Sequence, residues 1–175
     1  MRGWFSCATQ PVRVAGLEGV VDLGANGDTN CAALHDGSVY CWGAWDDANQ
    51  NNACWFSPRR IDGLDHVVSV AVGYEYLCSL DSSGAVRCLG NNKFGQLGDG
   101  TTRSRDTPLR VPLPRPALEL AAGNFHSCAV LNDRSLWCWG DNRVGELGDG
   151  TNENRPSPVQ TLPPGSVSRA TKVPR

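Results

Sequence analysis

The chain has 175 residues, of which 40% are hydrophobic, and this composition suits one compact domain with a core. Its 16 basic and 18 acidic residues give a net charge of −2 without any lysine or arginine run, so the electrostatic footprint of a nucleic-acid-binding protein is missing. No window is apolar over the length of a membrane span, and the opening MRGWFSCATQPVRV lacks the apolar region of a signal peptide.

Twenty glycines and eleven prolines place turns close together and disfavour long helices. Eight cysteines, none of them in a Cys-x-x-Cys motif, are more than a protein of a reducing compartment usually carries without a metal or redox role. The spacing of the cysteines must therefore indicate their purpose.

The cysteines reveal a repeat with a period of 47 to 50 residues. In chain order, each unit has a proline-initiated run, a short apolar run and a cassette bounded by two cysteines. The proline runs are PVRVAGL (11–17), PRRIDGL (58–64) and PLRVPLP (108–114), and a fourth, PVQTLPP (158–164), stands alone. The apolar runs are VVDLGA (20–25), VVSVAVG (67–73) and ALELAAG (117–123). The cassettes are CAALHDGSVYCWG (31–43), CSLDSSGAVRCLG (78–90) and CAVLNDRSLWCWG (128–140).

Each unit predicts four short strands. We expect a proline run to form an outer or edge strand, where proline is tolerated, and an apolar run to form a strand buried on both faces. A cassette is expected to be a hairpin, because two short apolar arms flank a turn such as HDG. The left-handed conformation of such turns suits Gly37 and Gly84, and Arg134 at the same place in the third unit has to accept a positive φ.

A glycine-rich phrase follows two of the cassettes, as GQLGDGTT (95–102) and GELGDGTN (145–152). A phosphate loop would need a following helix and a lysine, and a calcium site would need more oxygen ligands than Asp99 or Asp149 supplies. We therefore interpret the phrase as a connector between units. The stretch AWDDANQNNACWF (44–56) has lost it, which marks a remodelled site.

Repeated units of four strands predict an all-β fold made of β-propeller blades, with about three four-stranded repeats plus an extra strand. A β-sandwich is the alternative, but it does not explain why the units are alike. The expected organisation is a repeat domain 1–163 with units 11–57, 58–107 and 108–157, an extra strand 158–162 and a disordered tail 164–175. Because propellers have about four to eight blades, we expect a part of a larger propeller or a protomer completed by another chain.

Two segments, LAAGNFHSCAV (120–130) and LWCWGDNRVGELGDGTNENRPSPV (136–159), closely resemble the repeat of the regulator of chromosome condensation family. The resemblance extends over almost the whole chain and implies a propeller, commonly seven-bladed, here in a cysteine-rich member of bacterial type. The first unit departs most from the family pattern. In this unit Asn26 stands where the family has a glycine. The family histidine is present as His126 in the third unit, and it is replaced by Thr29 in the first unit and by Tyr76 in the second.

The two cysteines of each cassette face each other across the predicted hairpin, since the turn lies midway between them. Opposed Cα atoms at non-hydrogen-bonded pairs lie about 4.5 Å apart, within the range of a disulfide. We predict the bridges Cys31–Cys41, Cys78–Cys88 and Cys128–Cys138. The alternative is six buried, reduced thiols. Cys7 and Cys54 stand at equivalent positions of neighbouring units, and either their partners lie outside this chain or they are free.

No set of residues predicts catalysis, a metal or a cofactor. His35, His66 and His126 have no metal-ligand spacing, and no P-loop, dinucleotide or nucleophile motif occurs. His126 is expected to form structural hydrogen bonds, as the family resemblance also implies. Asp36 and Asp133 are expected in hairpin turns, and carboxylates for glycoside chemistry would have to be paired by the fold.

Six tryptophans are many for this length. Trp42 and Trp139 are expected in blade cores, whereas Trp4, Trp45 and Trp55 lie in irregular loops. A tryptophan-rich rim could contact a partner or a sugar, and packing between blades is the alternative. The loops that we expect to contact a partner contain Trp45, Trp55, Asp99 and Asp149.

Together these patterns predict a non-enzymatic propeller module that binds an unidentified protein, in an extracellular, periplasmic or cell-surface setting that keeps disulfides oxidised. The family includes a secreted bacterial member that inhibits β-lactamase by docking a propeller face onto it, so the resemblance implies a precedent. The alternatives are a guanine-nucleotide exchange factor for a small GTPase and a carbohydrate-binding, lyase or hydrolase propeller. The near-neutral charge, the lack of a basic tail and the paired cysteines argue against the exchange factor.

Overall fold

The computed structural model describes residues 13–46 and 52–168. Twelve β-strands and no helix occur in these two ranges. The strands are β1 (Val20–Asn26), β2 (Thr29–Leu34), β3 (Val39–Asp46), β4 (Asn52–Arg60), β5 (Val67–Gly73), β6 (Tyr76–Asp81), β7 (Val86–Gly90), β8 (Arg105–Arg110), β9 (Ala117–Ala122), β10 (His126–Leu131), β11 (Leu136–Gly140) and β12 (Arg155–Leu162).

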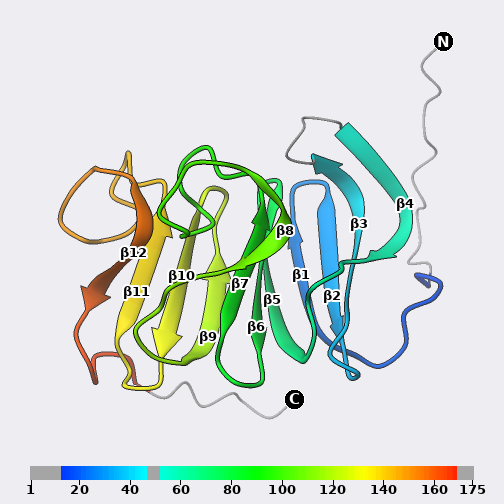
Figure 1. Cartoon of the computed structure of the whole chain (residues 1–175), viewed down its shortest axis with the longest axis horizontal. Helices are drawn as coiled ribbons and strands as arrows, with labels where there is room; N and C mark the ends of the chain where they lie inside the picture. Colours follow the sequence, from blue (N-terminus) through cyan, green and yellow to red (C-terminus); the bar gives the residue numbers. More distant parts are fainter. Residues whose placement is uncertain (1–12, 47–51, 169–175) are drawn as a thin grey trace.

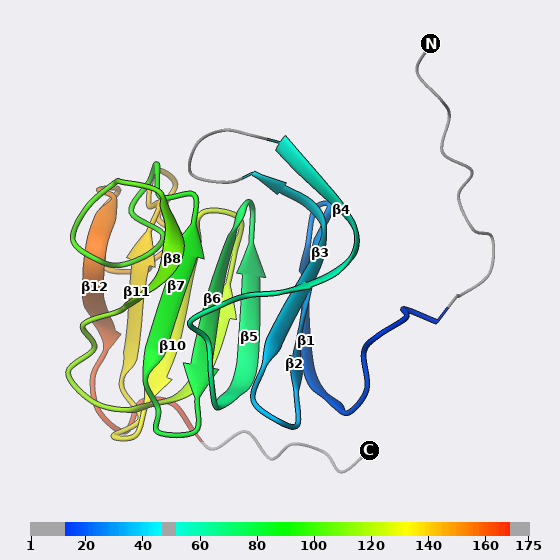
Figure 2. The ribbon, with the colours of Figure 1, turned by 45° about the vertical axis from the view of Figure 1, so that its right-hand side comes forward.

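The strands form three four-stranded antiparallel sheets in sequence order, β1–β4, β5–β8 and β9–β12. Figures 1 and 2 show the sheets standing side by side, with the first sheet on the right and the third on the left of Figure 1. The first strands of the sheets adjoin, because β5 contacts both β1 and β9. The all-β class and the four-stranded blades are therefore confirmed.

The proline-initiated runs form the last strand of a sheet instead of the first. β4, β8 and β12 pair with β3, β7 and β11, so each run belongs with the preceding cassette and is an edge strand, as predicted for proline. The expected extra strand 158–162 is part of β12 in the third sheet, and residues 13–19 form no strand. The phrase at 95–102 links β7 to β8 within one sheet, so its interpretation as a connector between units is wrong.

The cassettes form the hairpins β2–β3, β6–β7 and β10–β11. Their turns use the left-handed conformation, with φ of 82° at Gly37, 85° at Gly84 and 65° at Arg134. The carboxylates of Asp36 and Asp133 each accept hydrogen bonds from the backbone N–H and the hydroxyl of the serine two positions later, as expected of turn residues.

Two apolar clusters fill the spaces between the sheets. One joins the first and second sheets, and the other joins the second and third. The second sheet is covered on both faces, so every residue of β6 is buried. In β10, which has a neighbour on one face, buried and half-buried residues alternate. The expectation that the apolar runs are buried on both faces fails for 20–25 and 117–123, because β1 and β9, in the two outer sheets, are mostly exposed or half-buried.

A ring packs over a glycine at one end of two sheets. A Cβ added at Gly73 would collide with the ring of Tyr76, and one added at Gly123 would collide with the ring of His126. In the first sheet Thr29 has no ring, and Asn26 stands at the glycine position. The two departures of the first unit thus compensate each other. The imidazole of His126 packs over Gly123 and makes no hydrogen bond to a described residue, so the predicted hydrogen bonding of His126 stays a prediction.

Candidate interaction face

The turns β1–β2, β5–β6 and β9–β10 and the long loops β7–β8 and β11–β12 lie at one end of the strands, which is the upper end in Figure 1. Three aromatic side chains meet there. The ring centroids of Tyr74 and Phe125 lie 5.5 Å apart, and those of Phe94 and Phe125 lie 5.0 Å apart. We call these three residues the aromatic cluster. A backbone hydrogen bond of 2.9 Å from Tyr74 N–H to the carbonyl of Asn124 holds two of the turns together.

Charged side chains flank the aromatic cluster. The guanidinium of Arg143 lies 4.4 Å from the centroid of the Phe94 ring, and the ammonium of Lys93 lies 5.9 Å from it. Arg143 donates two hydrogen bonds to the carboxylate of Asp141, at 2.8 and 2.7 Å. These bonds lower the pKa of Asp141 and raise the pKa of Arg143, so the pair stays ionised over the physiological range.

The aromatic cluster borders a depression of about 280 Å³ at the upper end. Its lining consists of Asn124, Phe125, His126, Asp141, Arg143 and Glu146. Tyr74 beside it is 46% exposed, although its ring packs edge-on against that of Phe125. Aromatic residues and arginine dominate the binding energy of protein interfaces. The upper end therefore has the side chains of a protein-contact surface.

The β7–β8 loop that presents Phe94 is stiffened from within by two polar side chains. The amide of Asn92 donates to the carbonyl of Thr101 at 3.0 Å, and its oxygen accepts from Leu97 N–H at 2.9 Å. The carboxylate of Asp99 accepts from the N–H and hydroxyl of Thr101 and pairs with Arg105 at 3.1 Å. These bonds fix the loop, so Phe94 is held in position.

The β11–β12 loop repeats this arrangement with Asn142 and Asp149. Hydrogen bonds from Thr151 and Arg155 hold the pKa of Asp149 well below its ordinary value. Burial raises the pKa of Asp99, but its hydrogen bonds outweigh this effect and leave the pKa lowered. The side chains of Asp99 and Asp149 are only 8% and 3% exposed. The two predicted contact residues thus stabilise their loops from inside, with their carboxylates largely withdrawn from solvent.

The other predicted contact residues, Trp45 and Trp55, lie in the first sheet, whereas the aromatic cluster lies on turns and loops of the second and third sheets. Trp55 is half-buried in β4 against the core between the first two sheets, and the guanidinium of Arg59 lies 5.5 Å from its ring. Trp45 belongs to β3 opposite Ala53, but its side chain is outside the described part. Sequence reasoning missed the aromatic cluster. The available signal was an aromatic residue in each of the turns GYEY (73–76) and GNFH (123–126).

The predicted cysteine pairs lie opposite each other in the hairpins at disulfide distance, with Cα atoms 4.1 Å apart in each pair: Cys31 and Cys41, Cys78 and Cys88, Cys128 and Cys138. All of them except the half-buried Cys128 are buried. Cys7 lies outside the described residues. Cys54 is placed by its backbone alone, opposite Ala44.

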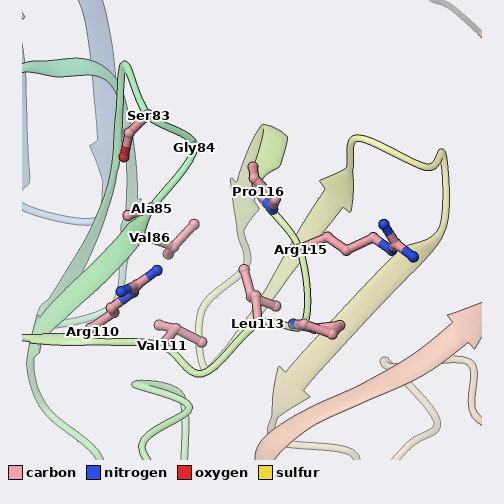
Figure 3. A pocket seen from close by; sticks show the side chains of 10 residues that line it. Ser83, Gly84, Ala85, Val86, Arg110, Val111, Leu113, Arg115 and Pro116 are labelled. Carbon is pink, nitrogen blue, oxygen red and sulfur yellow. The ribbon is translucent and has the colours of Figure 1, made fainter.

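A smaller cavity of about 150 Å³ lies at the opposite end, between the β6–β7 turn and the β8–β9 connection (Figure 3). Val86, Val111 and Leu113 contribute apolar side chains to a largely polar lining, and no histidine, cysteine, aspartate or glutamate lines it. Arg110 points toward Val86, whereas Arg115 points away and pairs with Asp133 at 3.1 Å. The cavity has no acid–base pair that could carry out catalysis.

Within 13–46 and 52–168, no group of three or more histidine, cysteine, aspartate or glutamate residues could hold a metal ion. None of the described residues belongs to a helix long and apolar enough to cross a membrane.

The chain was compared with known families, curated sequences and solved structures. A model of the regulator of chromosome condensation (RCC1) repeat matches residues 83–130 and 133–173, just over half of the chain, and a second model of this repeat matches 67–96 and 119–146. No curated protein sequence is significantly similar to the chain.

Solved structures agree with the family match. Yeast RCC1 (Prp20), whose structure was determined bound to Kap60, is 20% identical with a TM-score of 0.73, and the match covers 85% of this chain and 38% of that one. Human WBSCR16 is 25% identical with a TM-score of 0.73, and the match covers 87% of this chain and 42% of that one. The chain thus spans about two fifths of these proteins. With three blades of their propeller type and a family model over more than half its length, the chain belongs to the regulator of chromosome condensation (RCC1) repeat family.

Proposed function

We propose that the chain is a non-enzymatic propeller module that binds another protein through its upper end. The observation that carries this proposal is the aromatic cluster, exposed at Tyr74 and flanked by the Arg143–Asp141 pair. Large aromatic side chains and arginine on a rigid scaffold lose little conformational entropy when a partner binds. RCC1-type propellers are typically regulators or interaction modules and not enzymes, which supports the same assignment.

The setting is a second part of the proposal. Three cysteine pairs at disulfide distance support an oxidising environment, such as the extracellular space, the periplasm or the cell surface. Yeast Prp20 has been studied for its binding to Gsp1p and histones. At 20% identity its likeness to this chain concerns the fold, so we propose neither of these partners here.

The test begins with affinity capture of a partner under oxidising conditions and continues with titration of the purified partner. We expect the double variant Tyr74→Ala/Phe125→Ala to bind at least about tenfold more weakly, since loss of an interface hot spot costs more than about 1.4 kcal/mol. The matched control is His35→Ala, which removes an exposed ring from a hairpin turn at the opposite end. We expect this control to bind like the native chain.

Three outcomes would contradict the proposal. Equal binding by the native chain and the double variant would remove the upper end from the interface. Turnover in a panel of glycoside, ester and phosphate substrates would make the protein an enzyme. Accelerated nucleotide release from a small GTPase by the reduced protein would replace the proposed function with exchange activity.

A further inference from the structure

The contact between the second and third sheets is organised around one indole. Trp139 is fully buried, and its indole N–H donates to the carbonyl of Gln96 at 2.9 Å. Its ring lies on Gly98, where an added Cβ would come within 2.8 Å of the ring. The GQLGDG loop of the second sheet thus binds the tryptophan of the third sheet. We call the carbonyl and glycine positions of this phrase the indole cradle.

The third sheet contains a second indole cradle, formed by Glu146 and Gly148 fifty positions later in the chain. Its backbone has the same conformation, since φ is 69° at Gly98 and 70° at Gly148. In contrast to the first cradle, a Cβ added at Gly148 would meet nothing within 4 Å. The carbonyl of Glu146 receives no hydrogen bond from the part of the chain that the structure describes. The second cradle has the backbone conformation of the first and holds no side chain of the described residues.

The first sheet carries the matching indole. Trp42 stands at the position of Trp139 in its own sheet, and its N–H has no partner among the described residues. The second sheet has Leu89 at this position, and the sheet before it lacks the GQLGDG phrase. The leucine side chain has no N–H that needs an acceptor, so it suits a contact between two sheets, here called a seam, that has no indole cradle. Tryptophan at this position therefore indicates a preceding sheet that supplies one.

A second pair of positions follows the same rule. Between the second and third sheets, the buried hydroxyl of Tyr76 meets the hydroxyl of Ser127 at 3.0 Å. The corresponding residues at the open ends of the array are His126 in the third sheet and Asn30 in the first. Both are polar, and neither side chain has a hydrogen-bond partner among the described residues. Between the first two sheets the position of Ser127 is occupied by the buried, apolar Leu77.

Apolar residues at the open end of the first sheet complete the match. Val20 is 47% exposed, whereas the equivalent Val67 of the second sheet is 3% exposed. Leu23 is 60% exposed, and its equivalent Val70 is 5% exposed. The difference arises because the second sheet has a neighbouring sheet on this face, whereas no described residue covers this face of the first sheet. The two ends of the array therefore carry the two complementary halves of one inter-sheet seam.

We propose that the first sheet of one copy of this chain packs head to tail on the third sheet of a second copy, with Trp42 in the indole cradle of Glu146 and Gly148. Each copy contributes one open sheet at each end, so two such contacts join two copies into a closed ring. The ring has six blades, within the range of about four to eight found in propellers. The copies are held by two indole hydrogen bonds, the polar pairs of Asn30 with His126 and the apolar residues of β1.

The test is the mass of the full 175-residue chain in sedimentation equilibrium over a range of concentrations. We expect a dimer. Trp42→Phe keeps the apolar ring but leaves the Glu146 carbonyl unsatisfied, and we expect it to weaken dimerisation by about tenfold for each seam. The control is Trp137→Phe, because the Trp137 N–H bonds to Ser135 in its own hairpin at 3.0 Å. This control should dimerise like the native chain.

A mixing experiment tests the head-to-tail geometry. Leu23→Asp damages the first-sheet half of the seam, and Gly148→Val blocks the cradle. Each variant alone should be monomeric, and circular dichroism should show that each is folded. An equimolar mixture should dimerise again, because one of its two seams joins two undamaged halves. A native chain that stays monomeric at every concentration, a dimer insensitive to Trp42→Phe, or a mixture without restored dimer would overturn the proposal.

Discussion

The hydroxyl of Tyr76 provides a sharp test of how the second and third sheets are joined. It is fully buried and lies within hydrogen-bonding distance of the Ser127 hydroxyl at 3.0 Å, the carbonyl of Gly123 at 3.2 Å and the carbonyl of His126. Burial raises the pKa of Tyr76, so the phenol stays neutral and can donate at any physiological pH. Tyr76→Phe removes this oxygen while keeping the ring over Gly73.

We expect Tyr76→Phe to lower the free energy of unfolding by about 1–3 kcal/mol, because buried acceptors are left without their donor. For a chain of this size, each kcal/mol corresponds to a fall in melting temperature of about 2–4 °C. Thermal and urea unfolding followed by circular dichroism measure both quantities. The matched control is Tyr74→Phe, which removes a hydroxyl from a side chain that is 46% exposed and should change stability by less than about 0.5 kcal/mol.

A double-mutant cycle with Ser127→Ala adds a second constraint. If the two hydroxyls interact as the 3.0 Å contact indicates, the effects of Tyr76→Phe and Ser127→Ala should fall short of additivity by about 0.5 kcal/mol or more. Additive effects, or a Tyr76→Phe variant as stable as the Tyr74→Phe control, would refute this account of the seam.

Three further predictions concern the hairpins and the turns. The six cysteines of the three cassettes should resist alkylation in unfolded, unreduced protein and react only after reduction, as intact mass shows; six reactive thiols before reduction would contradict the pairing. Burial raises the pKa of Asp81, but hydrogen bonds from Ser83 and Arg87 outweigh it and bring the pKa to about 2. Because the pKa of Asp81 is lower in the folded than in the unfolded state, its ionised carboxylate contributes about 2 kcal/mol to the free energy of unfolding above about pH 4. This contribution is lost as the pH falls toward 2, so Asp81→Asn should make the stability fall less steeply at acidic pH. Gly73→Asn should cost at least about 1–3 kcal/mol through collision with the buried Tyr76 ring. Combined with Tyr76→Thr, the pairing of the first sheet, it should cost less than the sum of the two single losses, and additive losses would sink the proposed compensation.

The local parts of this fold were predictable from the sequence because their determinants are local. Two apolar arms around a short turn define each cassette hairpin, and cysteines at mirror positions must then face each other. Arg134 could be assigned a positive φ because it stands where the other units have glycine. Threefold repetition turned each weak local signal into a consistent one.

The assignment of the fourth strand failed because it depends on contacts between distant segments. A proline run lies between two cassettes, and periodicity alone cannot decide which of them it joins. The structure pairs β8 with β7 through a loop of fourteen residues, 91–104, whose course is fixed by buried side chains such as Asn92. Nothing local in the sequence shows that such a long loop returns to the same sheet.

The aromatic cluster was missed for a similar reason. Tyr74, Phe94 and Phe125 are separated by twenty to fifty-one positions and meet only because neighbouring sheets place their turns side by side. Tryptophan was the residue type expected at a contact surface, whereas Trp55 packs against the core between the first two sheets. Carboxylates in glycine-rich loops also suggested contact, although Asp99 and Asp149 serve the loops themselves.

The central claim is that the upper end of the propeller is the surface that binds another protein, and photo-crosslinking tests it most directly. A benzoylphenylalanine in place of Phe94 at the upper end is compared with one in place of Arg110 beside the lower cavity, each with the captured partner. Our account predicts a covalent adduct from position 94 and none from position 110. An adduct from position 110 alone would place the partner at the lower end and contradict the account.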